Sequence, residues 1–233
     1  YCRQHCNLSL KRRMLYSVLR YYYLQQIDGA YLFAPQMDML KRDYPRIRLN
    51  NPSHDLQLLD MAEQVWDSSA EQKIDQPVIY FDQPRNAKKR ENDCYDPKIE
   101  QRENELLELI IETIGANQLG YKLHPRTDVA TVPNGVHQLP RELFWEQYCS
   151  RAKLSDKILI SVDSSALMTP KIIFDKEPYV IALYRLFEDP TINRTEIDDL
   201  FGKLQTLCAP GKVLIPHSTQ ELKQILQNLS ENI

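Results

Sequence analysis

The chain has 233 residues, of which 42% are apolar, and a formal net charge of -3. This length can bury a substantial core in one large or two smaller domains. The nearly balanced charge excludes the strongly basic surface that nonspecific nucleic-acid binding needs, so we expect no nucleic-acid partner. Uninterrupted apolar runs such as 109–111 and 179–183 are far too short to cross a bilayer.

The first 76 residues carry weak structural signals. Residues 1–26 are basic and aromatic with helical spacing of apolar positions, which favours a surface or connecting helix over a membrane-surface helix. Residues 30–34 predict a short strand, and 43–76 are irregular and polar apart from a helical patch at 56–66. Because the chain begins with Tyr1 rather than Met, we expect further sequence upstream.

From residue 77 onward, short apolar strands alternate with amphipathic helices. A charged loop at 85–96 follows the first strand, and Gly115 is a candidate cap for the helix that comes next. Strands are predicted at 78–81, 118–123, 157–162, 179–184 and 212–215, and helices at 99–114, 141–151, directly after Ser164, 195–207 and 219–229. This alternation predicts βαβ units and a parallel sheet, in which ligands bind at the carboxyl ends of the strands.

His124 follows the second of these strands and lies in the segment Tyr121-Lys122-Leu123-His124-Pro125-Arg126. Pro125 restricts the backbone before it, and Lys122 and Arg126 flank the imidazole with positive charge. An imidazole held there can donate to a phosphate oxygen or pass a proton to a leaving group. An exposed loop histidine is the equally weighted alternative.

Ser164 and Ser165 follow the third strand, with Asp163 as a candidate helix cap. Hydroxyls and N–H groups at a helix start suit an anion, although ordinary capping explains the same residues. The chain has six glycines and lacks a glycine-rich phosphate loop, and it has no Asp-x-Asp triplet, so a metal-free mechanism without a cofactor is the default. Asp82, at the end of the first strand, points to the same edge of the sheet.

These motifs resemble a known family. The segment from Lys122 to Arg126 resembles the His-Pro motif of bacterial sialyltransferases, and 158–167 resembles their serine motif. The continuation 169–178 looks most like glycosyltransferase family 52, the lipooligosaccharide sialyltransferases, and 78–84 resembles the strand that opens that family's second domain.

The resemblance implies a GT-B fold with two Rossmann-like domains, of which 1–76 would be a remnant of the acceptor-side domain and 77–233 the CMP-sugar-binding domain. It implies inverting, metal-independent transfer of sialic acid from CMP-sialic acid to a galactoside of a cell-surface glycan. His124 would be the general acid on the CMP phosphate, and Lys122, Pro125, Arg126, Ser164 and Ser165 would bind the donor. These enzymes are cytoplasmic or peripheral at the inner face of the inner membrane, and a homodimer is a candidate assembly.

The chain departs from the family pattern in two places. Nothing matches the family's acidic motif of the first domain, from which we expect that most of that domain lies upstream. The family's catalytic Asp follows the strand at 78–81, where this chain has Arg85 after Pro84. Asp82 is therefore the candidate base, with Asp93 and Asp96 behind it. A polysialyltransferase, another CMP-sugar transferase, a non-catalytic nucleotide-binding fragment and a general phosphate-binding α/β protein remain alternatives.

Overall fold

The structure is a computed structural model that describes residues 28–39, 43–52, 57, 61, 73–83, 97–127, 132–188 and 192–231. The helix predicted within 1–26 and the charged loop at 85–96 lie outside the described residues. The helical patch predicted at 56–66 is described only at residues 57 and 61, both of which are helical.

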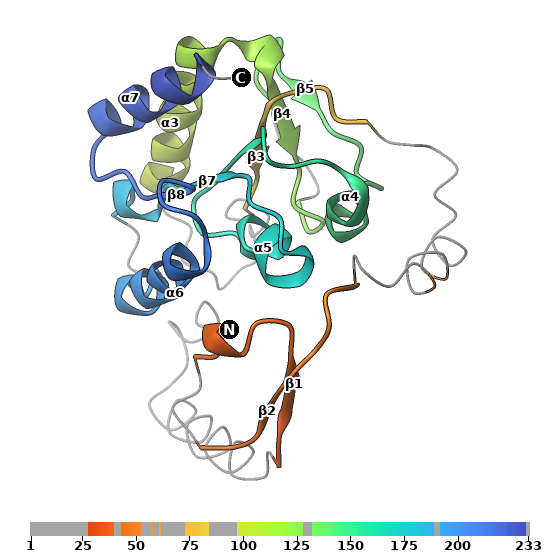
Figure 1. The fold of residues 1–233 in the computed structure, drawn as a ribbon. Helices are drawn as coiled ribbons and strands as arrows, with labels where there is room; N and C mark the ends of the chain where they lie inside the picture. Colours follow the sequence, from red (N-terminus) through yellow and green to blue (C-terminus); the bar gives the residue numbers. More distant parts are fainter. Residues whose placement is uncertain are drawn as a thin grey trace.

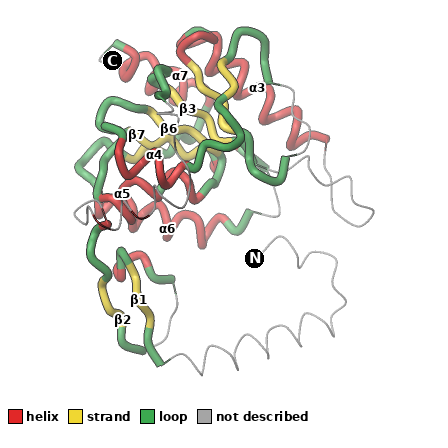
Figure 2. The backbone as a smooth tube through the Cα atoms, turned by 90° about the vertical axis from the view of Figure 1, so that its right-hand side faces the viewer, coloured by secondary structure: helices red, strands yellow, loops and turns green. Residues whose placement is uncertain are grey.

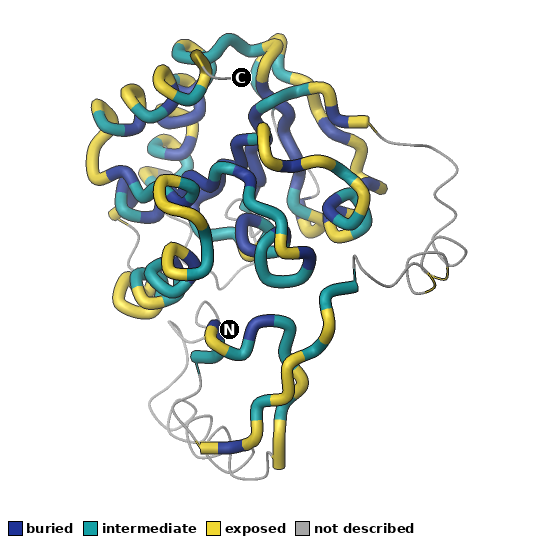
Figure 3. Tube along the Cα trace, viewed as in Figure 1, coloured by how far each residue is buried: buried dark blue, intermediate teal, exposed yellow. Residues whose placement is uncertain are grey.

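Six parallel strands form the centre of the larger unit (Figure 1). Their order across the sheet is β5-β4-β3-β6-β7-β8, and the register places Val78 opposite both Leu119 and Ile158. Every residue of β3, β4 and β6 is buried (Figure 3), as expected for parallel strands covered on both faces. The strands are β3 (Val78–Phe81), β4 (Leu119–Lys122), β5 (His137–Gln138), β6 (Ile158–Ser161), β7 (Tyr179–Ala182) and β8 (Val213–Leu214).

Helices cover both faces of this sheet. The helices α3 (Pro97–Ile114) and α7 (Thr219–Ser230) pack together on one face, and α4 (Trp145–Arg151), α5 (Thr169–Phe174) and α6 (Arg194–Leu207) lie on the other (Figure 1). Neighbouring residues of β3 contact the helices on opposite faces of the sheet, because successive side chains of a strand point to opposite faces. The Tyr80 hydroxyl donates to Glu103 of α3, whereas Phe81 meets the Trp145 ring of α4 edge-on at 4.7 Å between centroids.

The strand order is that of a doubly wound, Rossmann-like sheet. The chain starts at the centre with β3, moves outward to β5, returns to the centre at β6 and moves outward again to β8. The predicted α/β class with a helix-flanked parallel sheet is therefore confirmed. The direction of winding reverses between β3 and β6, which defines the switch point where such sheets leave a crevice.

Several predicted boundaries are confirmed and others are wrong. Gly115 ends α3 with a φ of 88°, a conformation that glycine adopts without steric penalty, and its N–H donates to the Ile111 carbonyl. The strands β2 (Arg46–Arg48) and β5 were not predicted, because four of their five residues are polar. The helix predicted from 141 begins only at Trp145, since the Leu143 N–H closes a turn on Pro140 and Phe144 is extended.

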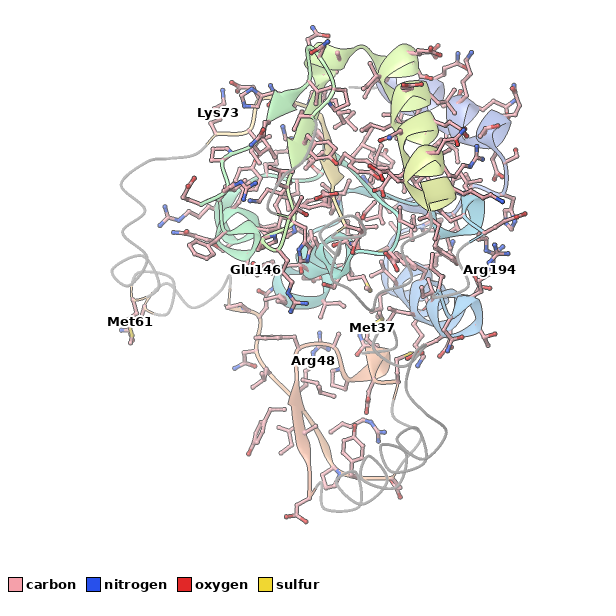
Figure 4. The ribbon with its side chains drawn as sticks, turned by 180° about the vertical axis from the view of Figure 1, so that it is seen from behind. Met37, Arg48, Met61, Lys73, Glu146 and Arg194 are labelled. Carbon is pink, nitrogen blue, oxygen red and sulfur yellow. The ribbon has the colours of Figure 1, made fainter. Side chains whose placement is uncertain are left out.

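A smaller unit lies beside α5 and α6 (Figure 2). It contains the parallel pair β1 (Ala30–Leu32) and β2 (Arg46–Arg48) and a short 3-10 helix, η2 (Pro35–Met37). The Lys203 ammonium of α6 donates to the Asp38 carbonyl, and Met37 is buried near this junction (Figure 4). The division of the chain at residues 76 and 77 stays a prediction.

A cavity lies at the same junction, and none of the candidate site residues lines it. Its lining includes Phe33 and Arg48 of the smaller unit and Lys171 and Leu207 of the larger. Among the described residues, no helix combines the length and the apolar character that a membrane crossing requires.

Candidate functional site

Three adjacent strands bring the predicted residues to one edge of the sheet. Asp82 follows β3, His124 follows β4 by two positions, and Ser164 and Ser165 follow β6. Because these strands are parallel and neighbours in the order β4-β3-β6, their carboxyl ends meet at the switch point. The sequence motifs therefore come together in space although they are widely separated along the chain.

His124 begins a tight turn. The Thr127 N–H donates to the His124 carbonyl at 2.9 Å, which closes a β-turn with Pro125 at its second position, where proline is favoured. Inside this turn, the Arg126 N–H donates to Nδ1 of the His124 ring at 3.0 Å. Nδ1 is thus an acceptor, and the neutral imidazole carries its proton on Nε2.

Asp82 lies beneath this turn and is only 8% exposed. Its Oδ2 accepts from the Thr127 hydroxyl at 2.7 Å and from the His124 N–H at 3.3 Å, and its Oδ1 accepts from the Tyr121 hydroxyl at 3.3 Å. Burial, with a smaller contribution from the Asp82 charge, raises the pKa of Tyr121. The Tyr121 hydroxyl therefore stays protonated and remains a donor to the carboxylate.

The two cations that flank His124 have different surroundings. The ammonium of Lys122 is buried and donates to the carbonyls of Pro140 and Arg141 at 3.0 and 3.1 Å. Burial lowers the pKa of Lys122. The structure thus directs Lys122 to the backbone of a neighbouring loop, whereas Pro125 and Arg126 are exposed on the turn.

The serine loop differs from the predicted helix start. The capping residue is Ser164 rather than Asp163, and its hydroxyl accepts from the Ala166 N–H at 3.3 Å. The helix that begins there is a single 3-10 turn, η5 (Ser165–Leu167), and α5 begins only at Thr169. The short helix predicted directly after Ser164 is therefore present as a 3-10 turn, and Ser165 is exposed at its start.

Two hydrogen bonds fix the serine loop against its neighbours. The Trp145 indole N–H donates to the Ala166 carbonyl at 2.9 Å, which ties the loop to α4. The Ser161 hydroxyl donates to the Phe81 carbonyl at 2.8 Å, which ties the end of β6 to the end of β3. Sequence reasoning did not single out Trp145 or Ser161 for this role.

Further polar groups continue along the same edge. Arg185 follows β7, donates to Asp198 of α6 and contacts the His217 ring after β8. Asp93 and Asp96, the secondary candidates for the base, lie outside the described residues. Within the described ranges, His, Cys, Asp and Glu side chains do not gather in groups of three or more that could hold a metal ion.

Comparisons with protein-family models, with curated proteins and with solved structures find no match to this chain.

Proposed function

We propose that this chain is the donor-binding part of a GT-B glycosyltransferase that transfers sialic acid from CMP-sialic acid to a terminal galactoside of a cell-surface glycan. The observation that carries the proposal is the position of His124, Ser164 and Ser165 after β4 and β6, the strands on either side of β3 at the switch point of the sheet. The resemblance of the two segments to the His-Pro and serine motifs of bacterial sialyltransferases supports it independently.

The groups at this edge suit a phosphate. His124 carries a proton on Nε2, Ser165 offers an exposed hydroxyl, and the exposed Arg126 guanidinium supplies positive charge. The phosphate of CMP-sialic acid is a diester that carries one negative charge and accepts hydrogen bonds from such donors. Binding there places the bond between phosphate and sugar next to His124.

In the proposed reaction, the oxygen of an acceptor hydroxyl forms a bond to the anomeric carbon of sialic acid. The bond from that carbon to the phosphate oxygen breaks on the opposite face, its electron pair stays on the oxygen, and the configuration inverts. The Nε2–H of His124 donates a hydrogen bond to the departing phosphate oxygen and stabilises the charge that develops on it, since a neutral ring cannot give up that proton without becoming an imidazolate. A carboxylate takes the proton of the acceptor hydroxyl, and this proton transfer contributes about 10²–10⁴-fold to the rate. Asp82 as the accepting carboxylate stays a prediction.

Calorimetric titration with CMP tests the donor site. We expect His124→Ala and the double variant Ser164→Ala/Ser165→Ala each to weaken binding about 10- to 100-fold, the range for losing hydrogen bonds to a charged group. His137→Ala and Ser155→Ala are matched controls, because both residues are exposed and lie at the opposite end of the strands. Absence of CMP binding by a folded chain would refute the proposal.

A transfer assay separates an active enzyme from a non-catalytic nucleotide-binding fragment. CMP-sialic acid and a galactoside would be incubated with the chain in the presence of EDTA, and the product would be detected by mass spectrometry. Transfer that requires His124 supports the enzyme. CMP binding without transfer supports the nucleotide-binding fragment instead.

A further inference from the structure

We infer that Thr127 and Asp82 form a positioning clamp that holds the His124 ring with its proton on Nε2. The clamp itself is defined by contacts within the chain, and its significance for catalysis rests on the proposed function. It assigns roles to two residues, one of which, Thr127, no sequence motif indicated.

The clamp consists of hydrogen bonds to both ends of the turn. Oδ2 of Asp82 accepts from the backbone N–H of His124, the first residue of the turn, and from the hydroxyl of Thr127, the last. The hydroxyl contact is the shorter, at 2.7 Å against 3.3 Å. Thr127 is 4% exposed and Asp82 is 8% exposed, so water competes little for these bonds.

The turn, once its ends are held, orients the His124 ring. With its ends held on one oxygen atom, the turn keeps the Arg126 N–H 3.0 Å from Nδ1 of His124. That N–H can donate only to an unprotonated Nδ1, which fixes the neutral tautomer. The proton therefore lies on Nε2, at the far end of the ring from the backbone that holds it, where it can donate a hydrogen bond to an oxygen of a bound phosphate.

The same contacts favour a positioning role for Asp82 over the role of base. A base must accept the proton of the substrate hydroxyl, directly or through one water. Both carboxylate oxygens of Asp82 instead accept hydrogen bonds from residues of its own chain, on Oδ1 from Tyr121 and on Oδ2 from Thr127 and His124. A carboxylate that holds a histidine loop in this way positions the histidine without touching the acceptor.

The first test uses NMR on the folded chain without ligand. Thr127→Val removes the hydroxyl at nearly constant shape, Thr127→Ser keeps it, and Thr113→Val is the control, because the Thr113 hydroxyl bonds to a helix carbonyl in α3. In Thr127→Val we expect amide exchange at Arg126 to become about three- to tenfold faster, the range for losing one hydrogen bond. The ratio of the Nε2–H tautomer to the Nδ1–H tautomer of His124, measured from its ring nitrogen shifts, should fall by a similar factor.

Thr127→Ser and Thr113→Val should leave both signals unchanged. Asp82→Asn is the second variant, because it keeps the shape of the side chain but replaces one accepting oxygen with a donor; it should produce the same two changes as Thr127→Val. Wild-type exchange at Arg126 and wild-type ring shifts of His124 in folded Thr127→Val or Asp82→Asn would overturn the inference.

The second test is a double-mutant cycle read by CMP affinity. We expect Thr127→Val to weaken CMP binding about three- to tenfold when His124 is present and less than twofold in the His124→Ala background, because the clamp acts through that ring. An equal loss in both backgrounds would overturn the inference. If CMP does not bind to the wild-type chain, the proposed function fails, whereas the NMR result still decides the clamp.

Discussion

The two stacked tyrosines beneath the candidate site provide a matched pair of substitutions. Tyr80 and Tyr121 are directly opposite each other in β3 and β4, both are buried, and their rings stack at 5.4 Å between centroids. Their hydroxyls differ in one respect. Tyr80 donates to Glu103 at 2.7 Å, whereas Tyr121 donates to Asp82 at 3.3 Å.

Because phenylalanine keeps the stacked rings, each substitution isolates one hydroxyl. We expect Tyr80→Phe to lower the free energy of unfolding by about 1.5–3 kcal/mol, the range for a hydrogen bond to a charged group. The longer bond of Tyr121 should contribute no more than about 1 kcal/mol. For a chain of this size, the Tyr80→Phe loss corresponds to a fall in Tm of roughly 3–12 °C.

Urea unfolding at pH 7, followed by circular dichroism, measures both variants, and calorimetry supplies Tm. The double variant measures how far the two hydroxyls are coupled, because the residues that carry them are in contact. A loss in Tyr121→Phe that equals or exceeds the loss in Tyr80→Phe would refute the assignment of the stronger bond to Glu103. A Tyr80→Phe variant as stable as wild type would refute it as well.

Three further predictions follow from other parts of the fold. Gly115→Ala should lower the free energy of unfolding by about 1–2 kcal/mol, because the φ of 88° at this position is unfavourable for alanine. Gly202→Ala should raise it by about 0.5–1 kcal/mol, because the new methyl group in α6 has open space around it. Thermal unfolding measures both variants, and a loss of stability in both would contradict the prediction. The hydrogen bond from Lys171 lowers the pKa of Glu177 below its usual 4.5. The extra stability of wild type over Glu177→Gln should therefore be complete above about pH 4.5 and disappear as the pH falls through the lowered pKa. Urea titrations at a series of pH values test this, and a stability difference that does not change with pH would contradict it. Lys122→Met should lower the free energy of unfolding by about 1–3 kcal/mol but leave CMP affinity within twofold of wild type, because the Lys122 ammonium bonds to backbone carbonyls. A tenfold loss of CMP affinity with unchanged stability would instead support a donor-binding role for Lys122.

Most of the sheet was predictable from the sequence because its longer strands contain runs of apolar residues and the helices between them are amphipathic. The site could be located for the same reason, since residues that follow parallel strands must meet at one edge. The order of the strands was not predictable, because the pairing of Val78 with Ile158 leaves no local pattern. Nor was the strand β5, whose two residues are both polar and exposed.

The directions of the side chains could not be predicted from the sequence either. Lys122 and Arg126 are equivalent in sequence, as cations two positions to either side of His124, yet one is buried on carbonyls and the other is exposed. Thr127 belongs to no recognised motif, and its short bond to Asp82 depends on two strand ends being adjacent in space. A signal was present in the tight spacing of Pro125 and Thr127 after a strand, which is typical of a closed turn.

The return of the chain to the centre of the sheet divides the fold into two segments that could be produced as separate polypeptides. Strands β3, β4 and β5 pair with one another and belong to the first segment, and β6, β7 and β8 belong to the second. The chain connects them through the exposed turn at Ser155 and Asp156, a position suited to cleavage. His124 belongs to one segment and Ser164 to the other, so a ligand that contacts both would draw the two fragments together, and their reassembly could be used as a sensor of nucleotide.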